Sequence, residues 1–442
     1  SGSGGSVGAH HAASLGKDVA IVERDTIGGE CPNYGCVPTK ALLYAAKTYE
    51  SAESAAFYGT RMGGKVSYDY NAVRKWKNFV VSRTGAAQGE KVFEDSDIHV
   101  LNGEAKFVSP HEIRIGTRRY SADKFLIATG TDVAIPPIPG LDAAGYVTFR
   151  EAINFKQLPD SLFILGGGAI GCEFAQVFSS FGVKIHIADF AERLLAKEDE
   201  EVSAIVQAIF ENRGIKVHTA ARVLRISKRE GKKVVHYEVA GKEHAAEVDE
   251  ILVATGKRPM LDLDLERAGV AHDKHGLKVN AYLQTSASHI YAAGDVIGPL
   301  MFTHTASYQS YIAANNMFSR SKIKPSYQVI PRCVFLEPEV ASVGISEAEA
   351  IERGFKIKKG MAAIASLGRA NTDNTLDGFV KVITKTDGTL LGASIVSPRA
   401  GEMIHELALA MQLKAKASDV AAMVHAYPTY SEAVKYACAN IE

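Results

Sequence analysis

The stretch from residue 161 to residue 190, SLFILGGGAIGCEFAQVFSSFGVKIHIADF, decides the fold of this chain. An apolar run leads into the pattern G-x-G-x-x-G, whose glycines are Gly166, Gly168 and Gly171. An amphipathic stretch follows, and a second apolar run ends at Asp189. A strand before the glycines, a helix after them and an acid at the end of the next strand predict a dinucleotide-binding βαβ unit. The residues of this unit expected to bind a nicotinamide nucleotide are Gly166, Gly168, Ala169, Ile170, Gly171 and Asp189.

The acid of this unit also bears on which nicotinamide nucleotide binds. In such units the glycines let the backbone approach the pyrophosphate at the helix N-terminus, and the carboxylate accepts a hydrogen bond from the ribose 2′-hydroxyl. The same carboxylate repels a 2′-phosphate, so Asp189 favours NADH over NADPH. Lys184 and Arg193 lie close by in the sequence and work against this preference.

The first 25 residues, SGSGGSVGAHHAASLGKDVAIVERD, resemble the later part of a second such unit. Gly2 and Gly5 stand where the second and third glycines belong, and the apolar run DVAIVE ends at Glu23. A flexible Ser/Gly linker would explain the glycines alone. The helix, strand and acid that follow at once favour the nucleotide-binding interpretation. We therefore expect an apolar strand that ends in glycine to precede Ser1 in the natural protein.

Two short strings support a duplicated design. FLIATG at 125–130 and ILVATG at 251–256 each follow their own nucleotide unit by a similar interval. Two nucleotide units in one chain predict two dinucleotides and electron transfer between them. Gly256 is therefore added to the residues expected to bind the nicotinamide nucleotide.

The composition excludes several other classes of protein. A chain of 442 residues should form two to four domains. Lys plus Arg and Asp plus Glu both total 50, so no global charge attracts nucleic acid or an anionic membrane. No apolar run reaches the roughly 18 residues that a spanning helix needs. Five cysteines, an odd number, favour a reducing compartment, and we expect a cytoplasmic protein with neither a nucleic-acid nor a membrane partner.

Two of the cysteines lie unusually close together, in GGECPNYGCVPTK at 28–40. Four residues separate Cys31 from Cys36, whereas metal sites usually place two residues between cysteines and add a second ligand pair. The other three cysteines lie far away and singly, so no metal site is predicted. A purely structural disulfide that closes so short a loop would add little stability. Because a helix N-terminus favours the reactive thiolate, the start of a helix at the second cysteine favours a redox-active disulfide.

The stretch GGECPNYGCVPTKALL resembles the active-site signature of the FAD-dependent pyridine nucleotide–disulfide oxidoreductases, and the resemblance extends from Ser1 to the final helix. It implies that hydride passes from nicotinamide to flavin and that electrons then reach the disulfide. It further implies that Cys36 lies against the flavin and that Cys31 faces the substrate. Lys40 would lie near the flavin and pair with Glu173. The FAD-binding residues that the resemblance implies are Gly2, Gly4, Gly5, Glu23, Arg24, Gly29, Lys40, Thr129, Gly130, Gly294 and Asp295.

The C-terminal part resembles the dimerisation domain of this family but departs from it at one position. The family carries His-Pro-Thr and then a Glu three positions further on, and that histidine acts as the acid–base in the active site of the partner subunit. Here HAYPTYSE keeps Glu432 in register but places Tyr427 where the histidine belongs. A phenol with a pKa of about 10 is a poor base compared with an imidazole of about 6.5. His425, two positions earlier, is interpreted as structural.

These observations leave one leading function and several alternatives open. The leading one is a homodimeric, dihydrolipoyl dehydrogenase-like enzyme that passes electrons between NAD(H) and a small disulfide or dithiol, with a role in cell redox homeostasis. Mercuric reductases carry a tyrosine at the register of Tyr427, which favours reduction of a metal ion as an alternative. A diaphorase-like quinone reductase or a redox sensor with little thiol turnover is a further alternative.

The resemblance also implies the fold and its boundaries. We expect an α/β fold with two Rossmann-like dinucleotide-binding domains and a C-terminal α+β dimerisation domain. The expected domains are an FAD-binding domain over 1–148, an NAD(P)H-binding domain over 149–265, a return to the FAD-binding domain over 266–325 and a dimerisation domain over 326–442.

Overall fold

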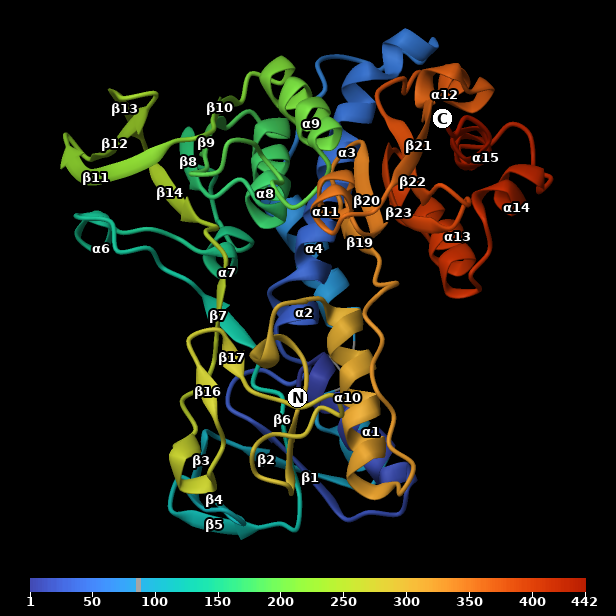
Figure 1. The fold of residues 1–442 in the computed structure, drawn as a ribbon. Coiled ribbons are helices and arrows are strands. Elements are labelled where there is room, and N and C mark those ends of the chain that lie inside the picture. The colour runs from blue at the N-terminus through green and yellow to red at the C-terminus, as the bar shows by residue number, and fades with distance from the viewer. Residues whose placement is uncertain (85–88) are drawn as a thin grey trace.

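The structure is a computed structural model that describes residues 1–84 and 89–442. Figure 1 shows a lower body that holds the N-terminus, an upper body around strands β8 (Ser161–Leu165) and β9 (Lys184–Ala188), and a third body at the C-terminal end. Parallel strands with helices form the core of the first two bodies, and an antiparallel sheet with helices forms the third. The predicted α/β class is confirmed. Within the described ranges no helix combines the length and the apolar character needed to cross a membrane.

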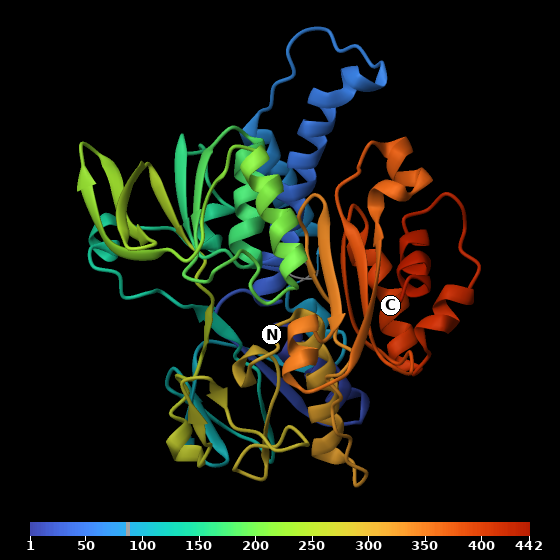
Figure 2. The ribbon, with the colours of Figure 1, turned by 45° about the horizontal axis from the view of Figure 1, so that its top comes forward.

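The upper body contains the βαβ unit predicted from 161–190. Strand β8 leads into helix α8 (Ala169–Ser180), and β9 then pairs in parallel with β8. The sheet has the order β10-β9-β8-β14, with β10 at Lys216–His218 and β14 at Glu250–Val253. Nearly every residue of β8 is buried, which is typical of a parallel strand covered on both faces. Helix α9 (Glu200–Asn212) follows β9 and lies beside the sheet of the third body, as Figures 1 and 2 both show.

The turn between β8 and α8 requires its glycines. Gly166 has φ of +109°, a backbone conformation that other residues rarely adopt. A Cβ atom on Gly171 would collide with the carbonyl oxygen of Gly166. The glycines therefore let the first turn of α8 approach the end of β8, as the sequence pattern requires.

The lower body is built from two separated parts of the chain. Helix α1 (Ser3–Ser14) leads to β1 (Val19–Glu23), which pairs in parallel with β2 (Ile98–Asn102). Further along, β18 (Ile290–Ala292) pairs in parallel with β6 (Phe125–Ile127). Helix α10 (Thr303–Phe318) packs against α1. These contacts support the return of the chain after the upper body, and we propose the domain boundaries 1–148, 149–265, 266–325 and 326–442.

The third body is a five-stranded antiparallel sheet of order β19-β20-β23-β22-β21. Its central strands β22 and β23 are buried almost throughout, and helix α13 packs on the sheet through Met403, Ile404 and Leu407. The elements of this body are β19 (Arg332–Val334), β20 (Glu339–Gly344), α11 (Glu347–Glu352), β21 (Ile357–Ala363), α12 (Gly368–Asp373), β22 (Phe379–Lys385), β23 (Leu390–Ser397), α13 (Ala400–Gln412), α14 (Ala417–Ala422) and α15 (Glu432–Ala439).

Small antiparallel sheets and several helices complete the first two bodies. The cysteine stretch supplies α2 (Glu30–Asn33) and α3 (Cys36–Ser54). The remaining principal elements are α4 (Tyr70–Arg83), α5 (Lys91–Glu94), β3 (Ala105–Ser109), β4 (Glu112–Ile115), β5 (Arg118–Ser121), β7 (Thr131–Val133), α6 (Leu141–Ala144), α7 (Phe149–Ala152), β11 (Arg222–Arg229), β12 (Lys232–Val239), β13 (Lys242–Val248) and β15 (Lys257–Pro259).

Candidate active site

A cavity of about 1630 Å³ joins the glycine end of α1 to the cysteine pair. Its lining includes Glu23 at the end of β1, and both Cys31 and Cys36. Every residue that the sequence assigned to FAD lies in this lining, although the residues come from distant parts of the chain. They are Gly2, Gly4, Gly5, Glu23, Arg24, Gly29, Lys40, Thr129, Gly130, Gly294 and Asp295.

The backbone around α1 fits a dinucleotide. Helix α1 has Gly2 at its N-cap and no side-chain cap, so its first N–H groups are available to a phosphate. Gly29 has φ of +72°, and a Cβ atom there would lie 2.5 Å from the Cα atom of Gly2. Asp295 accepts a hydrogen bond of 3.2 Å from Thr131, and desolvation raises the pKa of its carboxyl. Glycines, a free helix end and carboxylates therefore meet along one cavity large enough for FAD.

The cysteine pair forms an asymmetric pair of thiols. Cys31 lies in α2, Cys36 is the first residue of α3, and both are free thiols. A hydrogen bond with the Cys31 thiol lowers the pKa of Cys36 to about 6; desolvation opposes this effect, and the nearby Lys40 ammonium adds to it. The same hydrogen bond, together with desolvation, raises the pKa of Cys31 well above its usual range. The negative charge of the pair therefore lies on Cys36 and the proton on Cys31.

The structure brings Lys40 and Glu173 together as an ion pair. The Lys40 ammonium lies 2.9 and 2.8 Å from the two carboxylate oxygens of Glu173, and the Glu173 side chain is buried. The backbone N–H of Phe335 donates to the same carboxylate at 3.0 Å, and the Phe335 ring lies 4.5 Å from the Lys40 ammonium. These contacts hold a positive charge beside Cys36, where it stabilises a thiolate.

The residues assigned to the nicotinamide nucleotide cluster at the N-terminus of α8. One oxygen of Asp189 accepts from the Gly167 N–H at 2.6 Å, and the other accepts from the Ala191 N–H at 2.8 Å. Ile170 and Glu173, both on α8, reach the lining of the large cavity. The helix that begins at the second glycine loop therefore also forms a wall of the first site. The other residues assigned to this nucleotide are Gly166, Gly168, Ala169 and Gly171 around the same turn, and Gly256 after β14.

Tyr427 does not lie at the cysteine pair of its own chain. It is 78% exposed, is absent from the cavity lining and packs near Gly368 of α12. Glu432 is buried and accepts a hydrogen bond of 3.1 Å from the Thr429 N–H. The His425 ring lies 2.9 Å from a Glu406 oxygen, which agrees with its interpretation as structural. The assignment of Tyr427 to a partner's active site stays a prediction.

The sequence interpretation missed Thr303. Its hydroxyl lies 3.7 Å from the sulfur of Cys36, and the contact helps to lower the pKa of that thiol. The sequence signal that could have found it is a polar residue at the start of α10, a few residues after the turn that carries Asp295. His304 and His405 also line the cavity, from α10 and from α13 of the third body.

Comparison with known proteins identifies the family. Residues 1–310 match the model of the pyridine nucleotide-disulphide oxidoreductases, and residues 330–438 match the dimerisation domain of the same family. The chain belongs to this family. It is 32% identical to a dihydrolipoyl dehydrogenase of Bacillus subtilis (strain 168), over 98% of the chain and 95% of that protein. It is also 32% identical to a mercuric reductase of Bacillus cereus, over 99% of the chain and 70% of that protein.

A solved structure of a flavoprotein disulfide reductase is also similar over nearly its whole length. The Cu(II) complex of the HOCl-induced flavoprotein disulfide reductase RclA from Escherichia coli has a TM-score of 0.89 and 30% identity, covering 99% of this chain and 97% of that one. This oxidoreductase is therefore an enzyme of the flavoprotein disulfide reductase class, and its family uses FAD and NAD(P). The matched dimerisation domain indicates a homodimer.

In the reduced oxidoreductase, Cys36 should titrate with a pKa of about 6. Its thiolate is present above that pH and is protonated below it, so alkylation by iodoacetamide, followed by mass spectrometry, should slow as the pH falls through about 6. Cys31→Ala should move this midpoint upward, because it removes the hydrogen bond that lowers the pKa most. Cys438→Ala, which changes a buried thiol of α15, is the control and should leave it in place. An unmoved midpoint in Cys31→Ala would show that the two thiols do not interact.

Proposed function

We propose that the enzyme uses NAD(H) and exchanges two electrons with a small disulfide or dithiol through Cys31 and Cys36. The observation that carries this proposal is the placement of the two thiols in one cavity: Cys36 is the first residue of α3, near the Lys40 ammonium, whereas Cys31 lies in α2. Such a pair separates the sulfur that keeps the negative charge from the sulfur that meets the substrate. The proposed roles follow the family pattern, with Lys40 and Glu173 supporting Cys36.

The chemistry at the sulfurs can be written with atoms and electrons in balance. Residues of the cavity lining such as Gly2, Glu23 and Asp295 would hold FAD, which would supply the redox chemistry between the nicotinamide and the cysteines. In the reduced pair, the Cys31 sulfur attacks one sulfur of the substrate disulfide, loses its proton and releases the first substrate thiol. The Cys36 thiolate then attacks the Cys31 sulfur and expels the second substrate sulfur, which takes a proton. The protein is left with a Cys31–Cys36 disulfide, and the substrate leaves as two thiols.

The proposed working form is a homodimer in which Tyr427 of each chain faces the cysteine pair of the other. In support, the segment that matches the dimerisation domain carries large exposed apolar side chains, among them Leu413 at 70% and Val424 at 90% exposure. Exposed apolar side chains gathered on one segment are typical of a surface that is covered in the assembly. Glu432 would stabilise the turn that presents Tyr427, because it accepts from the Thr429 N–H.

A second candidate function is the reduction of a metal ion. Tyr427 favours it, because a phenol is a poor base for a dithiol. The relatives include a mercuric reductase, and the RclA structure is a Cu(II) complex. Among the residues in 1–84 and 89–442, no group of three or more His, Cys, Asp or Glu side chains is placed so that it could hold a metal ion. A metal-ion substrate would then bind to the two thiols themselves.

A substrate panel tests the proposal. NADH oxidation by the purified holoenzyme would be measured with lipoamide, Hg(II), Cu(II) and a quinone, each compared with the Cys31→Ala variant. The proposal predicts lipoamide-dependent oxidation that Cys31→Ala abolishes. Negligible lipoamide turnover with strong metal-ion reduction would replace it by the second candidate. Turnover of the quinone alone, unaffected by Cys31→Ala, would indicate a diaphorase-like enzyme.

The proposed preference for NADH rests on the charge of Asp189 and on the hydrogen bonds that Arg193 makes. The Asp189 carboxylate lies at the glycine loop, where it would repel a 2′-phosphate. The Arg193 guanidinium donates hydrogen bonds of 3.0 Å to the carbonyl oxygens of Ala196 and Glu198, so it is not directed to a ligand.

Asp189→Arg should shift the ratio of kcat/KM for NADPH over NADH upward by about tenfold or more, because it replaces a repulsive charge by an attractive one. Steady-state kinetics with the two nucleotides would measure the ratio. Asp189→Asn removes the charge without adding a cation and should give an intermediate shift. An unchanged ratio in both variants would remove Asp189 from the account of nucleotide choice.

We propose that the enzyme works in the cytoplasm and contributes to cell redox homeostasis. All five cysteines are free thiols in the structure, as suits a reducing compartment. Immunodetection after fractionation of the source cells would check the location, and recovery outside the cytoplasmic fraction would contradict it.

A further inference from the structure

The loop between β9 and α9 holds the second nucleotide site together. Within it, the Leu195 N–H donates to the carbonyl oxygen of Gly167 at 2.9 Å, so the loop packs on the glycine turn. The guanidinium of Arg193 donates to the carbonyl oxygens of Ala196 and Glu198, both at 3.0 Å. Arg193 is therefore committed inside its own loop as long as the loop keeps this shape.

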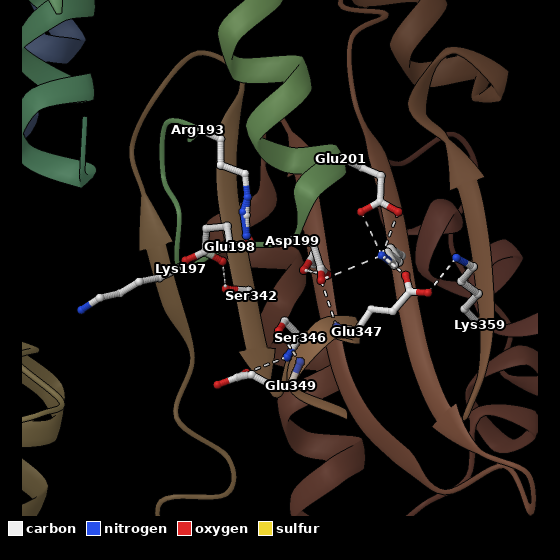
Figure 3. A network of polar contacts seen from close by, with 12 residues as sticks. Arg193, Lys197, Glu198, Asp199, Glu201, Ser342, Ser346, Glu347, Glu349 and Lys359 are labelled. Atoms are coloured by element: carbon white, nitrogen blue, oxygen red, sulfur yellow. Dashed lines mark hydrogen bonds and ion pairs between the residues drawn. The ribbon is translucent and has the colours of Figure 1, made fainter. Parts of the chain in front are cut away.

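The shape of this loop depends on the dimerisation domain. The Glu198 carboxylate, only 6% exposed as a residue, accepts from Arg332 of β19 at 2.8 Å and from Ser342 of β20 at 2.6 Å. Figure 3 shows Glu198 and Asp199 at the start of α9, facing the strands of that domain. A buried carboxylate with two donors is held far more firmly than a surface ion pair.

Asp199, the next residue, attaches the same part of the chain to the dimerisation domain a second time. Asp199 accepts from the Ser394 hydroxyl at 2.7 Å and from the Glu347 N–H at 3.0 Å. The Lys381 ammonium, on a residue that is 1% exposed, lies 2.8 Å from a Glu201 oxygen and 2.5 Å from a Glu347 oxygen. Glu198 and Asp199, at the end of this loop, are thus both fixed to the dimerisation domain. Glu198 is the one whose own carbonyl oxygen also accepts from Arg193.

We propose that Glu198 is a specificity-determining positioning residue: by anchoring the 190–198 loop to β19 and β20, it keeps Arg193 turned away from the nucleotide and so disfavours NADPH. A 2′-phosphate binds best to a guanidinium that can donate to it directly. With the loop anchored, two backbone carbonyl oxygens hold the Nη2 atom of Arg193 and so fix the direction of the guanidinium within the loop. The inference rests on the proposed NADH preference and adds a cause beyond the charge of Asp189.

The test uses the full-length holoenzyme and the oxidised nucleotides NAD⁺ and NADP⁺, which bind without reducing the flavin. Isothermal titration calorimetry would give both Kd values for the wild type and for Glu198→Gln. We expect the ratio of the NADP⁺ Kd to the NAD⁺ Kd to fall about tenfold in Glu198→Gln, the scale of one lost charge-assisted hydrogen bond. Adding Arg193→Gln to this variant should cancel the gain in NADP⁺ affinity, because the freed guanidinium supplies it.

Glu201→Gln is the matched control, since it weakens the same interdomain network at Lys381 without touching the loop. It should leave the Kd ratio unchanged. Equal shifts in Glu198→Gln and Glu201→Gln would indicate general loosening of the domains and overturn the inference, as would a Glu198→Gln ratio equal to that of the wild type. If Glu198→Gln fails to fold, Ser342→Ala removes one of the two donors and is judged by the same ratio.

The two proposals fail in different ways. A wild type that binds NADP⁺ as tightly as NAD⁺ would contradict the proposed NADH preference. A wild type that prefers NAD⁺, with a ratio insensitive to Glu198→Gln, would contradict only the role of Glu198.

Discussion

Replacing Cys36 by serine should reduce NADH-driven turnover by about a thousandfold or more, the scale on which enzymes lose activity without their covalent nucleophile. The serine hydroxyl cannot form a disulfide with Cys31, and it stays protonated at a pH where the Cys36 thiol, with a pKa of about 6, is ionised. The steady-state rate with the preferred substrate of the panel would measure the loss.

The spectrum of the reduced enzyme gives a second readout of the same variant. A thiolate against an oxidised flavin produces a charge-transfer absorbance, so Cys36→Ser should lose this band while flavin stays bound. Cys31→Ala is the matched control: it should lose turnover but keep the band, measured at alkaline pH because its Cys36 pKa is expected to rise. A band that survives in Cys36→Ser and disappears in Cys31→Ala would reverse the assigned roles of the two sulfurs.

Much of the fold and of the candidate cofactor site could be predicted because the signals are local. The glycine pattern that ends at Gly171 and the acid at Asp189 lie within one βαβ unit, where spacing along the chain fixes their positions in space. The same is true of Cys31 and Cys36 around the start of α3. Cys31 and Cys36 line the large cavity together with the residues assigned to FAD, whereas Gly171 and Asp189 lie at the turn between β8 and α8 outside that lining.

Contacts between distant elements could not be predicted in this way. Thr303 is 267 residues from Cys36, and Arg332 is 134 residues from Glu198. Neither pair has a sequence spacing that would mark it, because the packing of separate domains brings the side chains together. Lys40 and Glu173 form a similar long-range pair, which the family resemblance alone pointed out.

The role of Tyr427 depends on the assembly, beyond the sequence and the structure of one chain. The sequence register places it where the family has a base, and the structure of one chain leaves it 78% exposed, away from the cysteines of that chain. Whether it faces the cysteine pair of a second chain is decided by the assembly. A substitution at this position therefore tests the dimer and the chemistry together.

Tyr427→His should raise lipoamide turnover by about a hundredfold, the lower end of what a positioned acid–base group contributes. An imidazole with a pKa of about 6.5 can take a proton from Cys31 or from a substrate thiol near neutral pH, whereas a phenol with a pKa of about 10 stays protonated there. Activity should then rise with pH through an ionisation near the imidazole value, because the neutral ring is the base. The pH profile of kcat/KM for lipoamide would show both effects.

Tyr427→Phe separates the base from the hydroxyl. It removes the oxygen without adding a base, so it should leave lipoamide turnover low and create no new ionisation in the profile. If reduction of a metal ion is the true activity, the outcome is inverted: Tyr427→Phe weakens turnover of Hg(II) or Cu(II), and Tyr427→His gains nothing with lipoamide. A gain in Tyr427→His that also depends on protein concentration, as a dissociating dimer requires, would place the introduced imidazole at the active site of the second chain.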